Sequence, residues 1–227
     1  TAERTVLNPP VLLVTAGPTR EPIDDVRYLS NGASGTLGIE TALAARDAGW
    51  QVHLALGPVS SHPPLEGIHL HPFTTARDLE EIAVELWSEV DSLVATAAVC
   101  DYRPAEKIDG KRKKSAGDWH LRLVRNPAVL AARGAEKGDR VLVGFALEAT
   151  LDVEEALRKA VNKRLDLVLC NTPGNMGAAM GDYVWIEPGG HTDSLPAISK
   201  RELAQKLVEF IGTMVASRRR DRAFNGE

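Results

Sequence analysis

The segment spanning residues 11–38 constrains the fold more than any other part of the sequence. It opens with the apolar run VLLV, which is typical of a buried parallel strand. It ends with three glycines, Gly32, Gly35 and Gly38, that precede a helical pattern. A strand, a glycine-rich turn and a helix present free backbone N–H groups to a phosphate in many α/β proteins. The connecting residues TREPIDDVRYLSN exceed the usual turn length and carry two arginines, three carboxylates and an asparagine, so we expect chemistry here as well as binding.

Apolar runs and helical patterns alternate along the rest of the chain. This alternation predicts an α/β fold with a Rossmann-like, mostly parallel sheet and helices on both of its faces. The expected strands lie near residues 11–16, 51–56, 68–72, 92–98, 140–146 and 166–170. The expected helices lie near residues 35–48, 75–90, 127–136, 152–164 and 199–216. We expect a single domain over residues 1–217 and a disordered basic tail over residues 218–227.

Two segments interrupt the alternation. Residues 99–125 form a long connection whose last residues alternate like a strand. Residues 171–198 are rich in glycine and proline, and the sequence Pro188-Gly189-Gly190 is typical of a hairpin turn. We expect these segments to form a small antiparallel flap or dimerisation arm, with residues 171–198 as the main candidate.

The composition excludes several classes of protein. The net charge of −4 gives no overall footprint for nucleic acid binding. The two cysteines exclude a disulfide scaffold and fit a reducing cytoplasm. No apolar run approaches the ~18 residues of a membrane-spanning helix, and the polar start TAERT does not resemble a signal peptide. We therefore expect a soluble cytoplasmic protein that binds neither nucleic acid nor membrane.

A candidate site is assembled from the residues that follow the expected strands, because ligands of open α/β sheets bind outside the carboxyl ends of the strands. Small residues occur at nearly every strand end, which suggests that a ligand closely approaches the backbone. These segments are Gly17–Arg20, Ser30–Gly35, Gly57–Ser60, Ala97–Pro104, Gly144–Glu148 and Cys170–Pro173.

Two groups of lysines have both a simple and a functional interpretation. The run Lys111–Lys114 is by default a solvated loop, yet it follows Asp101 by ten residues and can fold over the strand ends to neutralise a polyphosphate. Lys159 and Lys163 lie on one face of a helix. Glu155 stands four residues before Lys159, so an ordinary ion pair is as plausible as a ligand contact.

The histidines and cysteines carry little functional signal. His69 and His71 alternate along an expected strand without a third ligand at zinc spacing, so packing is the better interpretation. Cys100 ends an apolar strand and is interpreted as a packing residue rather than a nucleophile. We expect no metal ligands on the protein itself.

Several segments in one order resemble a known family over about residues 10–212. They are TAGPTREPIDDVRYLSNGASGTLG, AAVCDYRP, KRKK, LVRNPAVL, VGFALE and the lysine pair before LDLVLCN. The family is phosphopantothenoylcysteine synthetase, the phosphopantothenate–cysteine ligase of coenzyme A biosynthesis. The resemblance implies a homodimer that joins 4′-phosphopantothenate to cysteine with CTP and Mg²⁺ through an acyl-cytidylate, releasing pyrophosphate and then CMP. It implies no flavin, because the flavin-dependent decarboxylase half of the bifunctional relatives is not part of the match.

The resemblance also assigns roles to individual residues. It gives Asn31 and Lys111 as catalytic residues, and it implies that Mg²⁺ binds through the nucleotide phosphates. The residues that match the nucleotide site are Gly17, Ala97, Asp101, Pro127, Ala128, Val129, Leu130, Phe145, Lys159 and Lys163. The residues that match the substrate site are Arg27, Asn31, Gly35 and Ala98.

The sequence departs from the family pattern at several of these segments. Gly32 stands where a bulkier, often basic residue is common, Thr36 replaces a lysine, and Cys100 replaces an alanine. The missing lysine motivates one alternative, a catalytically inactive nucleotide-binding homologue. A second alternative is an NAD(P)-binding reductase. The reductase needs a charged residue after the second strand, where this sequence has Leu56-Gly57-Pro58.

Overall fold

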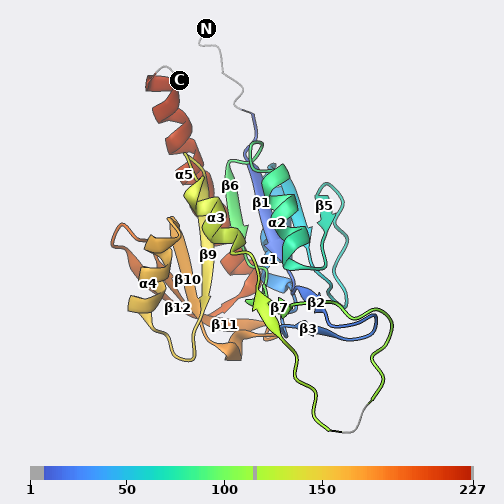
Figure 1. Cartoon of the computed structure of the whole chain (residues 1–227). Helices are drawn as coiled ribbons and strands as arrows, with labels where there is room; N and C mark the ends of the chain where they lie inside the picture. The colour runs from blue at the N-terminus through green and yellow to red at the C-terminus, as the bar shows by residue number, and fades with distance from the viewer. Residues whose placement is uncertain (1–7, 115–116, 226–227) are drawn as a thin grey trace.

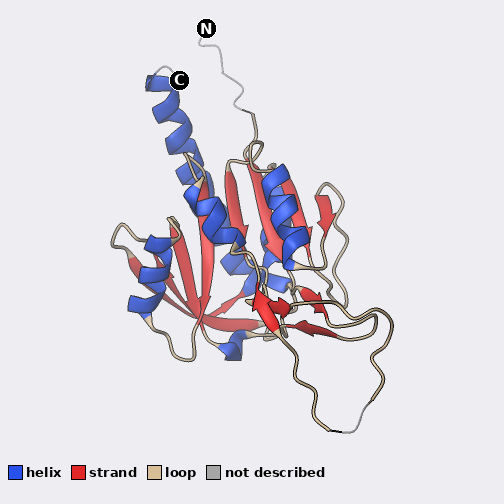
Figure 2. Ribbon diagram, viewed as in Figure 1, coloured by secondary structure: helices blue, strands red, loops and turns tan. Residues whose placement is uncertain are grey.

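The protein is built around one mixed sheet, seen in Figure 1 and coloured by secondary structure in Figure 2. The computed structural model describes residues 8–114 and 117–225. Within these residues the sheet has eight strands in the order β12-β11-β10-β9-β6-β1-β4-β5. The six strands from β10 to β5 run parallel to one another. Their bounds are β1 Val11–Ala16, β4 Gln51–Leu56, β5 His69–Pro72, β6 Ser92–Ala95, β9 Val141–Leu147 and β10 Leu167–Asn171.

Five α-helices cover the two faces of the sheet in the described part of the chain. Along β1, Leu12 and Val14 pack on one face with α1 and α5, whereas Leu13 packs on the other face with α2, α3 and α4. This period of two follows from the alternating direction of side chains along a strand. The helices are α1 Thr36–Asp47, α2 Ala76–Glu85, α3 Val129–Ala135, α4 Val153–Asn162 and α5 Lys200–Asn225. The fold predicted from the sequence, a mostly parallel sheet with helices on both faces, is confirmed.

The C-terminal residues differ from the sequence-based expectation. The expected disordered tail from residue 218 is wrong as far as Asn225, because α5 continues to that residue. The Arg218 Nη2 atom lies 2.5 Å from an oxygen of Asp166, and Arg219 Nη2 lies 2.7 Å from an oxygen of Asp91. These two ion pairs fix the basic helix against the amino ends of β10 and β6. Residues 1–7 and 226–227 of the expected domain and tail lie outside the described residues.

The two interrupting segments each form antiparallel structure, but they do not pair with one another. Residues 171–198 contain the predicted hairpin, β11 Met180–Ile186 and β12 Thr192–Ser199, and it extends the main sheet beside β10. Within residues 99–125, β7 Tyr102–Pro104 pairs with β8 Leu123–Arg125. A further small sheet joins β2 Arg20–Pro22 to β3 Tyr28–Ser30. The small antiparallel part of the fold is confirmed, whereas one flap shared by both segments is wrong, because β10 offers its free edge to β11.

The first turn of α1 packs so tightly against β1 that the residue at position 38 must be glycine. A Cβ atom on Gly38 would lie 2.3 Å from Thr96 Oγ1 and 2.5 Å from Ala16 Cβ. Overpacking of this kind costs about 1–3 kcal/mol. We therefore predict that Gly38→Ala lowers the free energy of unfolding by about that amount, measured by urea denaturation.

Gly189→Ala is the matched control for this prediction. A Cβ atom on Gly189 meets nothing within 4 Å, so its effect should stay within about 0.5 kcal/mol. Equal unfolding midpoints for the two variants would show that α1 can move away from β1 without cost.

Candidate functional site

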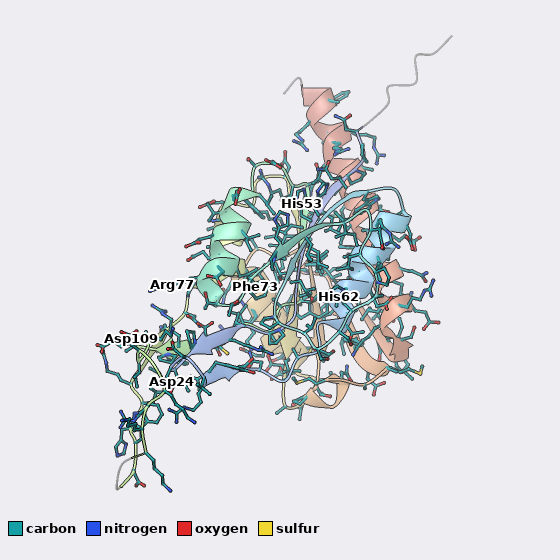
Figure 3. The ribbon with its side chains drawn as sticks, turned by 90° about the vertical axis from the view of Figure 1, so that its right-hand side faces the viewer. Asp24, His53, His62, Phe73, Arg77 and Asp109 are labelled. Carbon is teal, nitrogen blue, oxygen red and sulfur yellow. The ribbon has the colours of Figure 1, made fainter. Side chains whose placement is uncertain are left out.

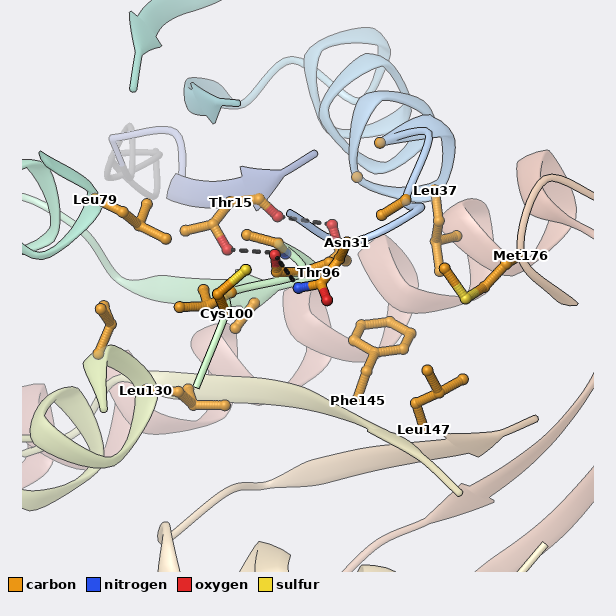
Figure 4. A pocket seen from close by; sticks show the side chains of 18 of the residues that line it. Thr15, Asn31, Leu37, Leu79, Thr96, Cys100, Leu130, Phe145, Leu147 and Met176 are labelled. Carbon is orange, nitrogen blue, oxygen red and sulfur yellow. Dashed lines mark hydrogen bonds between the residues drawn. The ribbon is translucent and has the colours of Figure 1, made fainter. Parts of the chain in front are cut away.

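A cavity of about 650 Å³ opens at the carboxyl ends of the central parallel strands (Figure 4). Its walls come from the loops that follow β3, β6 and β8, from the ends of β1 and β9, and from residues within the segment 171–177. A cavity at this edge is the usual ligand site of an open α/β sheet.

The floor of the cavity is a close contact between two glycine turns. Gly17 and Gly35 have positive φ angles of 80° and 74°. A Cβ atom on Gly35 would lie 2.9 Å from Val59 Cγ1 and 3.1 Å from Gly17 N. Gly35 is also the N-cap of α1, and no side chain caps it. Thr36 N donates to Ser34 Oγ at 3.5 Å, and the N–H groups of Leu37 and Gly38 remain available to an anionic ligand.

Asn31 is held against the loop that follows β6. Its Nδ2 atom donates a hydrogen bond to the carbonyl of Ala98 at 2.9 Å, as Figure 4 shows. The same loop is joined to the end of β1, because Ala98 N donates to Gly17 O and Thr19 N donates to Ala98 O. These bonds fix the orientation of the Asn31 amide at the cavity wall.

The loop between β8 and α3 is positioned by a residue that the sequence reasoning did not select. Asn126 Nδ2 donates to Cys100 O at 2.8 Å, and Asn126 N donates to Asp101 O at 2.8 Å. Arg103 Nη1 donates to Asn126 Oδ1 at 3.2 Å. These contacts bring residues 127–130 opposite Asp101. An asparagine before a proline and a helix start is a recognisable signal for such backbone bonding.

The cavity contains most of the expected site residues. Those that line it are Asn31, Gly35, Ala97, Ala98, Asp101, Pro127, Ala128, Val129, Leu130, Phe145 and Lys163. Gly17 lies beneath Gly35 and does not line the cavity. Arg27, Lys111 and Lys159 also lie outside the lining residues.

Lys159 forms the ion pair with Glu155 that the simple interpretation predicted, and a second ion pair with Glu148. Its Nζ atom lies 2.5 Å from an oxygen of Glu148 and 3.5 Å from an oxygen of Glu155. The hydrogen bond that Lys159 donates to the Glu148 carboxylate raises the pKa of Lys159. Lys163, at the C-cap of α4, lines the cavity instead.

Lys111 and Arg27 belong to a separate part of the structure. The described residues of the connection between β7 and β8 project from the sheet (Figure 1), and Lys111 is exposed among them. The guanidinium group of Arg27 bonds to the carboxylate of Asp24 and to Arg112 O. In this structure neither side chain reaches the cavity.

Lys200, at the start of α5, adds a cation that the sequence reasoning missed. It lines the cavity together with Thr36, and burial lowers the pKa of its amine. Gly32, Thr36 and Cys100, the three departures from the family pattern, all line the same cavity. Lys200 lies far from these residues in sequence, which is why no local motif revealed it.

The histidines pack together, as interpreted from the sequence. His53 stacks on His69 and His71 with ring centroids 4.9 Å and 5.2 Å away. Within residues 8–114 and 117–225, no group of three or more histidine, cysteine, aspartate or glutamate residues is arranged to hold a metal ion. Over the same residues, no helix has both the length and the apolar character to cross a membrane.

An open, mostly parallel sheet with a cavity at its carboxyl edge defines an α/β ligand-binding protein of the open-sheet class. Residues 7–214 match the family described as the DNA/pantothenate metabolism flavoprotein C-terminal domain. The chain belongs to this family.

Curated relatives agree with this assignment. The coenzyme A biosynthesis bifunctional protein CoaBC of Bacillus subtilis (strain 168) is 36% identical over 208 residues, which are 89% of this chain and 51% of that protein. A cysteine/cysteine sulfinic acid decarboxylase from an unknown prokaryotic organism is 34% identical over 214 residues, 92% of this chain and 60% of that protein. The chain thus spans little more than half the length of these relatives.

Solved structures show the same fold. The C-terminal domain of CoaBC is similar with a TM-score of 0.79 and 31% identity, covering 93% of this chain and 98% of that one. A Cab2 mutant in complex with phosphopantothenate-cysteine has a TM-score of 0.71 at 18% identity, covering 96% of this chain and 89% of that one. The second likeness shows the fold alone. The resemblance drawn from the sequence motifs is confirmed.

The two cysteines should differ in reactivity. Cys100 is partly exposed in the cavity, whereas Cys170 is fully buried. Burial raises the pKa of the Cys100 thiol, so it holds less thiolate than a free cysteine. We predict that iodoacetamide labels Cys100 before Cys170, more slowly than free cysteine, and faster as the pH rises. Mass spectrometry of peptides measures both rates, and equal labelling of the two thiols would contradict the prediction.

Proposed function

We propose that the chain joins 4′-phosphopantothenate to cysteine with CTP. The observation that carries this proposal is the convergence of most of the family-marked residues on one cavity at the carboxyl edge of the sheet. The similarity to coenzyme A biosynthesis proteins supports it independently.

The proposed reaction has two steps. First, a carboxylate oxygen of 4′-phosphopantothenate attacks the α-phosphorus of CTP, and the bond to pyrophosphate breaks to leave an acyl-cytidylate. Second, the amine nitrogen of cysteine attacks the acyl carbon and loses a proton, and CMP leaves with the bonding electron pair. Both steps develop negative charge on oxygen, which oriented N–H groups and cations stabilise.

The residues around the cavity have different roles in this reaction. The open first turn of α1 and Lys163 favour the anionic ligands, and the small side chains of Ala97 and Ala98 leave room for them. The fixed amide of Asn31 orients the activated carbonyl. Asp101 and residues 127–130 contact the nucleotide, with Phe145 beside them.

The cavity also fits the expected role of Mg²⁺. Asp101 is the acidic residue among the described residues that line it. Mg²⁺ commonly binds through substrate phosphates and only one or two carboxylates, so these residues suit an ion that arrives with CTP. When bound, Mg²⁺ neutralises charge on the transferred phosphates.

Lys111 and Arg27 require a second copy or a closer approach of their loop to contact the ligands. We extend the proposal to a homodimer in which the long connections bring such contacts to the neighbouring site. The exposed apolar side chains Tyr28, Tyr102 and Leu123 on the two small sheets support a protein interface there. Light scattering should give about twice the mass of one chain.

The free thiols Cys100 and Cys170 support a reducing, cytoplasmic location.

The direct test is pyrophosphate release from CTP. Protein supplied with CTP, 4′-phosphopantothenate, Mg²⁺ and cysteine should release pyrophosphate and form the ligated product, and ATP in place of CTP tests the nucleotide preference. Absence of pyrophosphate with every nucleotide would contradict the proposed function.

Asn31→Ala should separate the two steps. Loss of one donor to a developing oxyanion typically lowers turnover by about 10²–10³-fold. We predict a loss of that order in product formation, while single-turnover pyrophosphate release is largely retained and acyl-cytidylate accumulates. The exposed Asn162, outside the cavity, provides the control Asn162→Ala with unchanged rates. An equal loss in both steps would argue against this role for Asn31.

The two alternatives give different results in the same assays. Thr36, in place of the family's lysine, favours an inactive homologue. In such a homologue, CTP would protect Cys100 from iodoacetamide, but no pyrophosphate would be released. In a reductase, NADPH would protect Cys100 instead. The end of β4 gives the reductase no support, because Gly57 packs there against Pro18 O and Phe73.

A further inference from the structure

Asp24 is a buried carboxylate that the chemistry of the cavity does not use. It lies in the turn between β2 and β3, and its side chain is completely shielded from solvent. Its Oδ1 atom accepts hydrogen bonds from Val26 N at 2.9 Å and from Arg27 N at 2.8 Å. Oδ1 therefore stabilises the turn between β2 and β3.

The second oxygen of Asp24 reaches a distant part of the chain. Its Oδ2 atom accepts from Arg112 N at 3.1 Å, from Arg27 Nε at 2.9 Å and from Arg27 Nη2. Arg27 Nη2 also donates to Arg112 O at 3.1 Å. Asp24 and Arg27 therefore hold both polar backbone atoms of Arg112, the residue next to Lys111.

Neighbouring contacts extend this attachment. Asp25 N donates to Gly110 O, Gly110 N donates to Asp25 Oδ2 at 2.9 Å, and Ile108 N donates to Ile23 O. Figure 3 labels Asp24 and Asp109 near each other at this junction. The ring of Trp119, further along the same loop, lies 5.4 Å from the Arg27 guanidinium carbon and 4.4 Å from that of Arg112.

The negative charge of Asp24 stabilises the contact between its own turn and the segment around Arg112. A buried carboxylate is costly unless it is paired and hydrogen-bonded, and here N–H donors from two segments satisfy it. The Arg27 guanidinium holds the pKa of the Asp24 carboxyl well below its usual range. An asparagine would turn an NH₂ group toward N–H donors and lose much of this bonding.

We infer that Asp24 is a positioning residue, which fixes the base of the loop 105–122 so that Lys111 and Arg27 are presented together. This inference rests on the proposed function for the role of Lys111. The attachment of the loop itself rests only on the contacts of Asp24. Asp24 touches no residue that lines the cavity in these contacts, so it acts through its neighbours.

The first test measures the loop without any substrate. Asp24→Asn should increase tryptic cleavage after Lys113 and Lys114 several-fold and make Trp119 more accessible to acrylamide quenching, with Trp119→Phe identifying its signal. Asp78→Asn is the matched control, because Asp78 also accepts backbone bonds, from Thr74 N and Thr75 N, but at the start of α2. Unchanged cleavage and quenching in a folded Asp24→Asn protein would overturn the inference.

The second variant covers the case in which Asp24→Asn does not fold. Asp25→Asn removes the bond from Gly110 N and the ion pair with Lys107, and its side chain is half exposed. It should loosen the same loop in the same direction by a smaller factor. A folded Asp25→Asn protein with wild-type cleavage would also count against the attachment.

A double-mutant cycle then tests whether Asp24 acts through Lys111. Alone, Asp24→Asn should lower kcat for ligation by roughly 10- to 100-fold, as a small misplacement of a catalytic group does. On a Lys111→Ala background it should lower kcat little further, whereas full additivity would overturn the role. If wild-type protein shows no ligation, the proposed function fails, yet cleavage and quenching still decide whether Asp24 holds the loop.

Discussion

The rest of the structure depends on how closely α1 approaches the end of β1. Three glycines allow it: Gly17 and Gly35 form two turns in contact, and Gly38 lies directly on Ala16 and Thr96. Because no Cβ atom separates these backbones, the first turn of α1 lies close to the strand ends and lines the cavity. The positions of Asn31 and of the loop after β6 follow from this approach, since both are bonded to the end of β1 or to each other.

The cavity that results has an uneven charge. The open start of α1, Lys163 and Lys200 provide positive potential, whereas Asp101 is the acidic residue among the described lining residues. Several carboxylates outside the cavity are paired, as Asp24 is with Arg27 and Glu148 with Lys159. Desolvated cations and a helix start attract phosphates strongly, so the electrostatics of the cavity agree with nucleotide chemistry.

The sequence predicted the regular parts of the fold well because their signals are local. The strand at 11–16 and the helix at 35–48 differ from β1 and α1 by no more than a residue at either end. Long-range contacts escaped it. A disordered tail was expected from residue 218, but this residue lies in α5 and pairs with Asp166. No pattern near residue 218 indicates a carboxylate that lies so far away in the sequence. Lys159 shows both situations. Its ion pair with Glu155 is predicted by their spacing in the helix, whereas its ion pair with Glu148 is not.

The same limit applies to the candidate site. The segments that follow the expected strands include Asn31 and Asp101, whereas residues 127–130 were selected by the resemblance to the family. Asn126 and Lys200 depend on contacts between segments that only the folded chain brings together. Lys111 was selected by its resemblance to family members, and its distance from the cavity lining follows from the projection of its loop.

The ion pairs of Arg218 and Arg219 have a practical consequence. They tie the end of α5 to the amino ends of β10 and β6, and Arg219 Nη1 also donates to Asn8 O at 2.5 Å. The start and the end of the described chain therefore emerge side by side, at the end of the sheet opposite the cavity (Figure 1). An affinity tag, a surface linker or a fused protein attached at either terminus would leave the mouth of the cavity unobstructed. Immobilised protein should thus remain open to small molecules.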